Sequence, residues 1–424
     1  MITFEDIKRT FVTSLWFVFL TFPIMVIRVN FVQETVAWRW HNMLYIGFGT
    51  FFGGLVWRFF LTRRRVSVKP TVQVTTGEQE EKRAAGTETT MERVRRILGQ
   101  PKVRRSIYAA VALFLVTAPF ASSLYQINIL ITAFIYVMLA LGLNIVIGLG
   151  GMLHLGYIAF YAVGAYTYGV LYRFFEIGFW VALPIGAFLA TMAGILLALP
   201  VLRLRGDYLA IVTLGFAEIV RIVINNMTEF TGGPGGIGSI PRPSLFGIDL
   251  SLHNASIYIY FLVLLAVILT IFVVWRFENS RLGRALVAMG EDDIAAEAMG
   301  VDVMKVKLIA FALGSVWAGI GGVLFASRTT FINPASFTVW QSIIVLSCVV
   351  LGGMGSIPGS IVGALVLILV PEYLRAFSDY RMLMFGGVLV IMMVFRPSGL
   401  IRKKRKAYTF PESPPAGEPA GGEA

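Results

Sequence analysis

Long apolar runs separated by short polar gaps dominate the chain from end to end. A helix needs about 20 consecutive apolar residues to cross a bilayer. By that measure the pattern predicts twelve membrane spans. They lie near residues 11–28, 43–61, 106–122, 127–148, 155–172, 180–202, 208–226, 255–276, 308–326, 338–354, 356–374 and 382–396. The fold class that follows is an all-α polytopic membrane protein.

Composition agrees with the hydrophobic pattern. Of the 424 residues, 57% are hydrophobic and 14% are charged, whereas soluble proteins carry about 25% charged residues. The net charge of +12 would favour nucleic acid as a partner of a soluble protein. Here the basic residues gather in the gaps between apolar runs, where they orient a membrane protein. We therefore expect membrane lipid around the spans and no nucleic-acid partner.

The basic residues also predict the orientation of the spans. If the spans alternate in direction, the gaps 62–105 and 277–307 and the segment Arg402–Lys406 all fall on one side of the membrane. Cytoplasmic loops carry the excess of lysine and arginine. Both termini are then expected to be cytoplasmic.

Gaps and composition divide the chain into four parts. We predict an N-terminal membrane hairpin of two helices at 1–61 and a polar, basic cytoplasmic linker at 62–105. A transmembrane core of about ten spans follows at 106–400 and contains the cytoplasmic loop 277–307. The tail 401–424 is rich in proline, glycine and glutamate, a composition typical of disorder.

Candidate catalytic chemistry is sparse. The sequence contains no G-x-x-x-x-G-K-[ST] phosphate loop, so ATP hydrolysis by a Walker site within this chain is not expected. Cys348 is the single cysteine, and the three histidines are far apart with no ligand spacing. We expect no catalytic residues, no metal site and no cofactor-binding site.

The loop between the spans 255–276 and 308–326 reads as a water-exposed helical unit. Acidic residues 291–293 favour the first turn of a short helix, and Gly300 is placed to end it. We predict that this helix docks on an energy-supplying partner. The predicted docking residues are Ile294, Ala295, Ala296, Glu297, Ala298, Met299 and Gly300.

A glycine-rich segment, TGGPGGIG at 231–238, is predicted on the non-cytoplasmic side. Glycine and proline let the backbone change direction without a helix. One interpretation is a flexible turn, and the other is a gate or partner-contact loop. The candidate gate residues are Thr231, Gly232, Gly233, Pro234 and Gly236.

Glu218 and Arg221 lie one turn apart near the middle of the span 208–226. Ionisable groups within spans are costly and point to a function. The pair either neutralises itself and locks helices together or lines a translocation path. Glycines elsewhere in the spans favour close helix packing, with a few as hinges. Two glycine-rich stretches, LGGMLHLG (149–156) and LGGMGSIPG (351–359), also echo each other.

Several of these segments resemble known transport proteins. The stretch from Ile294 to Gly300 is similar to the cytoplasmic coupling loop of ABC importer permeases, whose pattern is Glu-Ala-Ala, three residues, Gly; here Ile294 replaces the glutamate. The segments 142–166, 202–222, 231–237 and 349–360 resemble LivM-type permeases of branched-chain amino acid importers. This resemblance extends from about residue 106 to 400.

The resemblance implies a ten-helix permease architecture and a multi-subunit importer in the bacterial inner membrane. The implied partners are a LivH-type second permease, LivG- and LivF-type ATPases that use the ATP, and a periplasmic binding protein. That binding protein would deliver leucine, isoleucine or valine for transport by alternating access. The same machinery with urea, short amides or a broader amino-acid set is an alternative. A self-sufficient secondary transporter is an alternative of another class.

Overall fold

The computed structural model describes residues 27–30, 35–38, 113–201, 204, 206–243, 251–373, 386, 387, 390, 394 and 399–401. By its contacts the chain separates into two units, Met1–Arg104 and Arg105–Ala424. In the first unit, β1 (Ile27–Asn30) and β2 (Thr35–Trp38) pair in an antiparallel ribbon. Residues 27 and 28 were predicted to end a helical span and lie in β1 instead. The rest of the predicted two-helix hairpin is outside the described residues.

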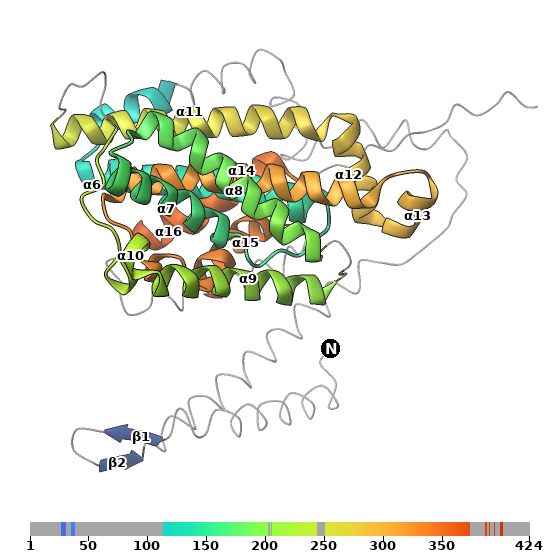
Figure 1. Ribbon diagram of the computed structural model, residues 1–424, viewed down its shortest axis with the longest axis horizontal. Helices are drawn as coiled ribbons and strands as arrows, with labels where there is room; N and C mark the ends of the chain where they lie inside the picture. The colour runs from blue at the N-terminus through green and yellow to red at the C-terminus, as the bar shows by residue number, and fades with distance from the viewer. Residues whose placement is uncertain are drawn as a thin grey trace, which may run out of the picture. The chain divides into compact units, whose positions relative to one another are not determined.

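The second unit is helical. After a helix at 113–121 come α6 (Leu124–Asn144), the π-helix η1 (Ile145–Leu149), α7 (Ile158–Phe175), α8 (Phe179–Val201), α9 (Asp207–Asn226), α10 (Thr228–Thr231), the 3-10 turn η2 (Gly233–Gly235), α11 (Leu252–Glu278), α12 (Arg281–Glu291), α13 (Asp293–Ala298), α14 (Val303–Thr329), the 3-10 turn η3 (Pro334–Ser336), α15 (Val339–Gly352) and α16 (Ile357–Tyr373). The long helices lie side by side in a bundle (Figure 1).

Every predicted span from 127–148 to 356–374 coincides with one of these helices. Within the part of the chain that the structure describes, five helices are long and apolar enough to cross a membrane. The fold class of an all-α polytopic membrane protein is therefore confirmed. The count of ten core helices is not, because most of the predicted span 382–396 lies outside the described residues.

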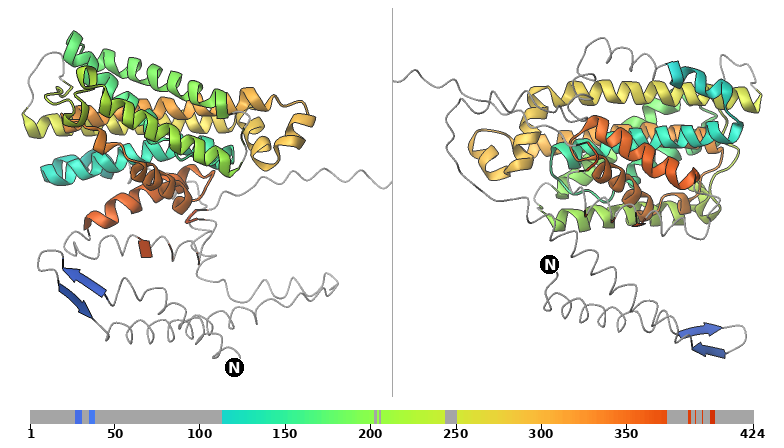
Figure 2. Two further views of the ribbon diagram at one scale, coloured as in Figure 1. Left: turned by 60° about the horizontal axis from the view of Figure 1, so that its bottom comes forward. Right: turned by 180° about the vertical axis from the view of Figure 1, so that it is seen from behind.

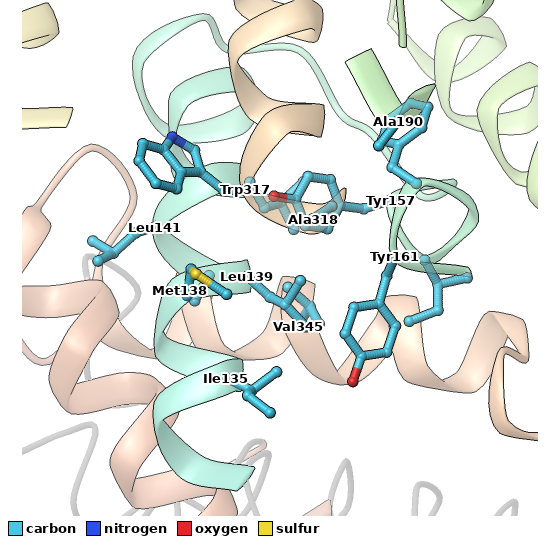
Figure 3. Packing of buried hydrophobic residues seen from close by; sticks show 14 of the residues in the cluster. Ile135, Met138, Leu139, Leu141, Tyr157, Tyr161, Ala190, Trp317, Ala318 and Val345 are labelled. Carbon is cyan, nitrogen blue, oxygen red and sulfur yellow. The ribbon is translucent and has the colours of Figure 1, made fainter. Parts of the chain in front are cut away.

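The centre of the bundle is α6, which packs against α11, α14, α15 and α16. Every α6 residue from Val137 to Asn144 is buried. Figure 3 shows α6 side chains facing Trp317 of α14, Tyr157 just before α7, Tyr161 of α7, and Val345 of α15. The second layer is α14 with α7 and α8, as the views in Figure 2 show from two further directions.

Close approach of α7, α8 and α14 depends on residues without side chains. A Cβ atom on Gly164 of α7 would lie 2.1 Å from the carbonyl oxygen of Gly319 in α14, and one on Gly319 would lie 2.7 Å from the carbonyl oxygen of Gly186 in α8. Small residues let membrane helices approach to backbone contact, where van der Waals packing stabilises them.

Polar groups fix both ends of α6. Ser123 and Gln126 form a reciprocal capping box at the start of the helix. At the end, the Asn144 side-chain oxygen accepts a hydrogen bond from Gly355 N at 2.8 Å. The helix then widens into the π-helical turn η1, and residues 150–156 run irregularly to α7. This end of α6 faces the predicted coupling loop.

Candidate functional site

The loop between α11 and α14 is built of two short helices that lie beyond one end of α14 (Figure 1). Ser280 caps α12 by accepting from Gly283 N at 3.1 Å. Asp292 caps α13, since its Oδ1 accepts from Ile294 N at 2.9 Å and from Ala295 N at 3.0 Å. Gly300, with φ of +85°, follows α13 in the left-handed conformation that ends helices. Local capping thus gives the loop a defined shape.

The loop rejoins the bundle at the start of α14. The Asp302 carboxylate accepts from Lys305 N at 3.0 Å and pairs with the Lys305 ammonium at 2.8 Å. The hydrogen bond from that ammonium holds the pKa of the Asp302 carboxyl below its usual value. Asp302 was not among the predicted residues, although an aspartate before a helical apolar run is a cap signal.

The seven predicted docking residues divide into one buried anchor and an exposed surface. Ala296 is 5% exposed and faces the protein, whereas Ile294 is 64% and Met299 85% exposed. Ala295, Glu297, Ala298 and Gly300 are exposed as well. Large apolar side chains exposed together on a loop mark a surface that another protein covers. Their coupling role stays a prediction.

The contact that joins this loop to the bundle was missed by sequence reasoning. A Cβ atom on Gly290 of α12 would lie 2.8 Å from the carbonyl oxygen of Leu149, the last residue of η1. A Cβ atom on Gly151 would in turn lie 3.0 Å from the carbonyl oxygen of Gly290. Leu286 and Met289, also on α12, are buried beside it. The three-residue spacing of Gly283, Leu286 and Met289 is a helical signal that was present in the sequence.

The predicted gate residues lie in an ordered, folded segment. Thr231 Oγ1 donates to Met227 O at 2.7 Å, and Gly232, Gly233 and Gly236 adopt positive φ angles. Contrary to the expectation of a turn without a helix, the segment includes α10 and η2. Ile237 and Ile332 exchange two backbone hydrogen bonds of 2.9 Å, which tie the segment to the end of α14. Pro234 is exposed at the surface. These contacts leave the gate role untested.

The structure brings Glu218 and Arg221 together. Arg221 Nε donates to both carboxylate oxygens of Glu218 at 3.0 Å, and Arg221 Nη2 also contacts Oε1. The side chains are 36% and 32% exposed, respectively. Since both belong to α9, the pair neutralises charge within one helix and does not itself lock two helices together.

Removing the carboxylate should destabilise the protein more than it slows transport. In Glu218→Gln the Arg221 guanidinium loses its partner within α9, which coincides with the predicted span 208–226, and an unpaired charge within a span is costly. We expect a lower melting temperature in detergent, with recovery in Glu218→Gln/Arg221→Gln. Glu229→Gln, at an exposed site beyond α9, is the matched control. A Glu218→Gln protein of full stability but without transport would favour the path interpretation.

Comparison with known proteins places residues 125–394 in a family model described as a branched-chain amino acid transport system permease component. The chain is 44% identical over 339 residues to the high-affinity branched-chain amino acid transport system permease protein LivM of Escherichia coli, covering 75% of this chain and 80% of that protein. It is 27% identical over 238 residues to a probable LivM of Methanocaldococcus jannaschii, covering 53% and 68%. Identity to the permease LivH of Escherichia coli is 25% over 288 residues, covering 63% and 91%. No solved structure matched.

Proposed function

The chain belongs to the family of permease components of branched-chain amino acid transport systems. We propose that it is one of two unlike permease subunits of an ATP-driven importer in a bacterial inner membrane. Its cargo is leucine, isoleucine or valine, delivered by a periplasmic binding protein. The chain is a transport subunit and not an enzyme. It binds no cofactor itself, and LivG- and LivF-type ATPase partners hydrolyse the ATP.

The second permease in this proposal is a LivH-type chain. Support comes from the relatedness of the chain to both LivM and LivH proteins, which are named as permeases of one kind of transport system. The apolar surface that this chain leaves exposed, where a second permease could pack, is also extensive. Apolar α9 side chains such as Tyr208, Ile211 and Ile219 are more than half exposed. With both termini cytoplasmic, the loop from α11 to α14 faces the ATPases.

The observation that carries the proposal is the double contact of this loop. Its outer side presents Ile294 and Met299 to a partner, while its inner side places Gly290 against the backbone of η1. A movement of the partner is therefore passed to α6, the centre of the bundle, through backbone contact. Interiors this tightly packed switch between discrete arrangements and do not deform smoothly. The mechanism is alternating access driven by a rigid loop.

Placing arginine at Ala298 should abolish ATP-driven uptake. Ala298 is exposed on the outer side of α13, where a long charged side chain would prevent an apolar surface from docking. Loss of an interface hot spot of roughly 2 kcal/mol lowers affinity about 30-fold. We expect leucine uptake and stimulation of the ATPase to fall together while the protein still inserts. The measurement is uptake of labelled leucine by proteoliposomes containing the complete complex.

Ala288→Arg is the matched control, because Ala288 is exposed on the neighbouring helix α12 and tests added charge alone. Normal uptake by Ala298→Arg would remove the coupling role. Ion-driven transport by this chain without ATPases would indicate a secondary transporter. Normal leucine uptake in a deletion strain that loses urea uptake would reassign the cargo.

A further inference from the structure

A stripe of polar side chains runs along one face of the otherwise buried helix α6. Tyr125, Asn128, Thr132 and Tyr136 recur at three- and four-residue spacings, so they share one helix surface. The last three are partly buried and Tyr125 is exposed, whereas α6 is the most buried of the candidate spans. The stripe ends abruptly, because every α6 residue after Tyr136 is buried.

Polar groups of two other helices complete this surface. The Tyr136 hydroxyl donates to Gln341 Oε1 of α15, and Arg328 Nε of α14 donates to Asn128 Oδ1 at 3.3 Å. Gln341 and Arg328 are themselves partly buried. Tyr161 of α7 lies close enough to interact electrostatically with Tyr136 and Arg328. Its hydroxyl makes no hydrogen bond with any residue that the structure describes.

Among the residues that the structure describes, Arg328 has no carboxylate partner to balance its charge. Among the described residues, no carboxylate lies within 4 Å of its guanidinium, and its one hydrogen bond goes to a neutral amide. It sits in the last turn of a helix that is long and apolar enough to span the membrane. A cation in such a helix is costly unless an anion pairs with it. Guanidinium groups bind carboxylates through two parallel hydrogen bonds.

We propose that this surface, formed by Asn128, Thr132, Tyr136, Arg328 and Gln341, is the entry half of the substrate path and binds the zwitterionic end of an α-amino acid. Arg328 takes the carboxylate. The neutral oxygens of Tyr136, Asn128 and Gln341 accept hydrogen bonds from the ammonium group. This inference rests on the proposed function, and it specifies where in the chain that cargo is bound.

Two features favour a path over a contact that only stabilises the bundle. Buried structural polar groups normally satisfy one another and exclude water, but the side chains of this set are only partly buried, and on α6 they extend from Asn128 to Tyr136. The apolar wall beside it, where the Phe325 ring is tilted against Tyr161 and the Phe337 ring meets Tyr161 edge-on, suits an aliphatic side chain. Below Tyr136, the buried segment Val137–Asn144 closes the other half of α6.

The single native cysteine makes the exposure of the stripe directly measurable. In a Cys348→Ala background within the complete importer, Thr132→Cys should react with a charged, impermeant methanethiosulfonate. The thiolate forms readily only in water, so it should react at least about tenfold faster than Leu139→Cys on buried α6 or Leu265→Cys on the apolar surface of α11. Leucine-loaded binding protein should slow that reaction. Labelling of Thr132→Cys no faster than the two controls would overturn the proposal.

The charge of Arg328 supplies a second test. Arg328→Gln should lower leucine uptake about 30-fold, Arg328→Lys should recover part of it because a cation is retained, and ATPase co-purification should not change. Arg173→Gln, at an exposed arginine of α7, is the control and should transport normally. Loss of the second permease on purification of Arg328→Gln would assign Arg328 to the subunit interface and overturn the proposal. Absence of ATP-driven leucine uptake in the Cys348→Ala complex would instead count against the proposed function.

Discussion

Valine at position 290 is expected to uncouple the importer while leaving its subunits assembled. The added Cβ would stand 2.8 Å from the Leu149 carbonyl oxygen and 3.0 Å from the Gly150 carbonyl carbon, both of which are backbone atoms. Backbone cannot turn aside as a flexible side chain can, so α12 must move away from η1. Overpacking of this kind typically costs about 1–3 kcal/mol. The displaced loop would no longer transmit its movement to α6.

The measurement is leucine uptake together with ATPase activity in the reconstituted complex. For Gly290→Val we expect uptake to fall on the order of 100-fold, which corresponds to about 2.7 kcal/mol of coupling. ATPase subunits should still co-purify, because Ile294 and Met299 on the outer side of the loop are unchanged. Ala288→Val places the same side chain on an exposed position of α12 and should transport normally. Full uptake by Gly290→Val would show that the movement of the loop is transmitted to the bundle through other contacts.

Hydrophobic runs were sufficient to predict the helices of the core, because a membrane span must satisfy its backbone internally and be apolar over its length. The shape of the predicted coupling loop could be inferred equally well, since its caps and its glycine stop are local signals. Asp292 and Gly300 act within α13 and its immediate neighbours. Local sequence decides such features, so they can be predicted from the chain alone.

Contacts between distant segments could not be predicted in this way. Asn144 Oδ1 accepts a hydrogen bond from Gly355 N across 211 residues of chain, and so links the end of α6, just ahead of the first glycine-rich stretch, to the second stretch. The echo indicated where two helices end, at Leu149 and Gly352, but not that these ends touch.

Arg328 shows how a small boundary error hid a functional candidate. The predicted span ended at residue 326, which left Arg328 outside it as an ordinary loop cation, whereas α14 continues to Thr329. Helix ends are the least reliable part of a pattern-based prediction. The α6 stripe of Asn128, Thr132 and Tyr136 was readable as a four-residue period within an apolar run. The role proposed for this stripe depends on the Arg328 guanidinium, which only the fold brings beside Asn128.

Valine in place of Gly164 is expected to prevent the bundle from packing. A Cβ at this position would stand 2.1 Å from the Gly319 carbonyl oxygen and 2.7 Å from two further Gly319 backbone atoms, so α7 and α14 must separate along their shared face. The expected loss of stability is about 3 kcal/mol, at the upper end of the range for overpacking, because the opposing surface is backbone. We expect little monodisperse protein and, in what survives, a melting temperature lower by on the order of 10 °C. The control is Gly215→Val in α9, where a Cβ meets no atom within 4 Å. Equal melting temperatures for the two variants would mean that α7 and α14 separate without loss of stability, and glycine at 164 would then need an explanation in transport itself.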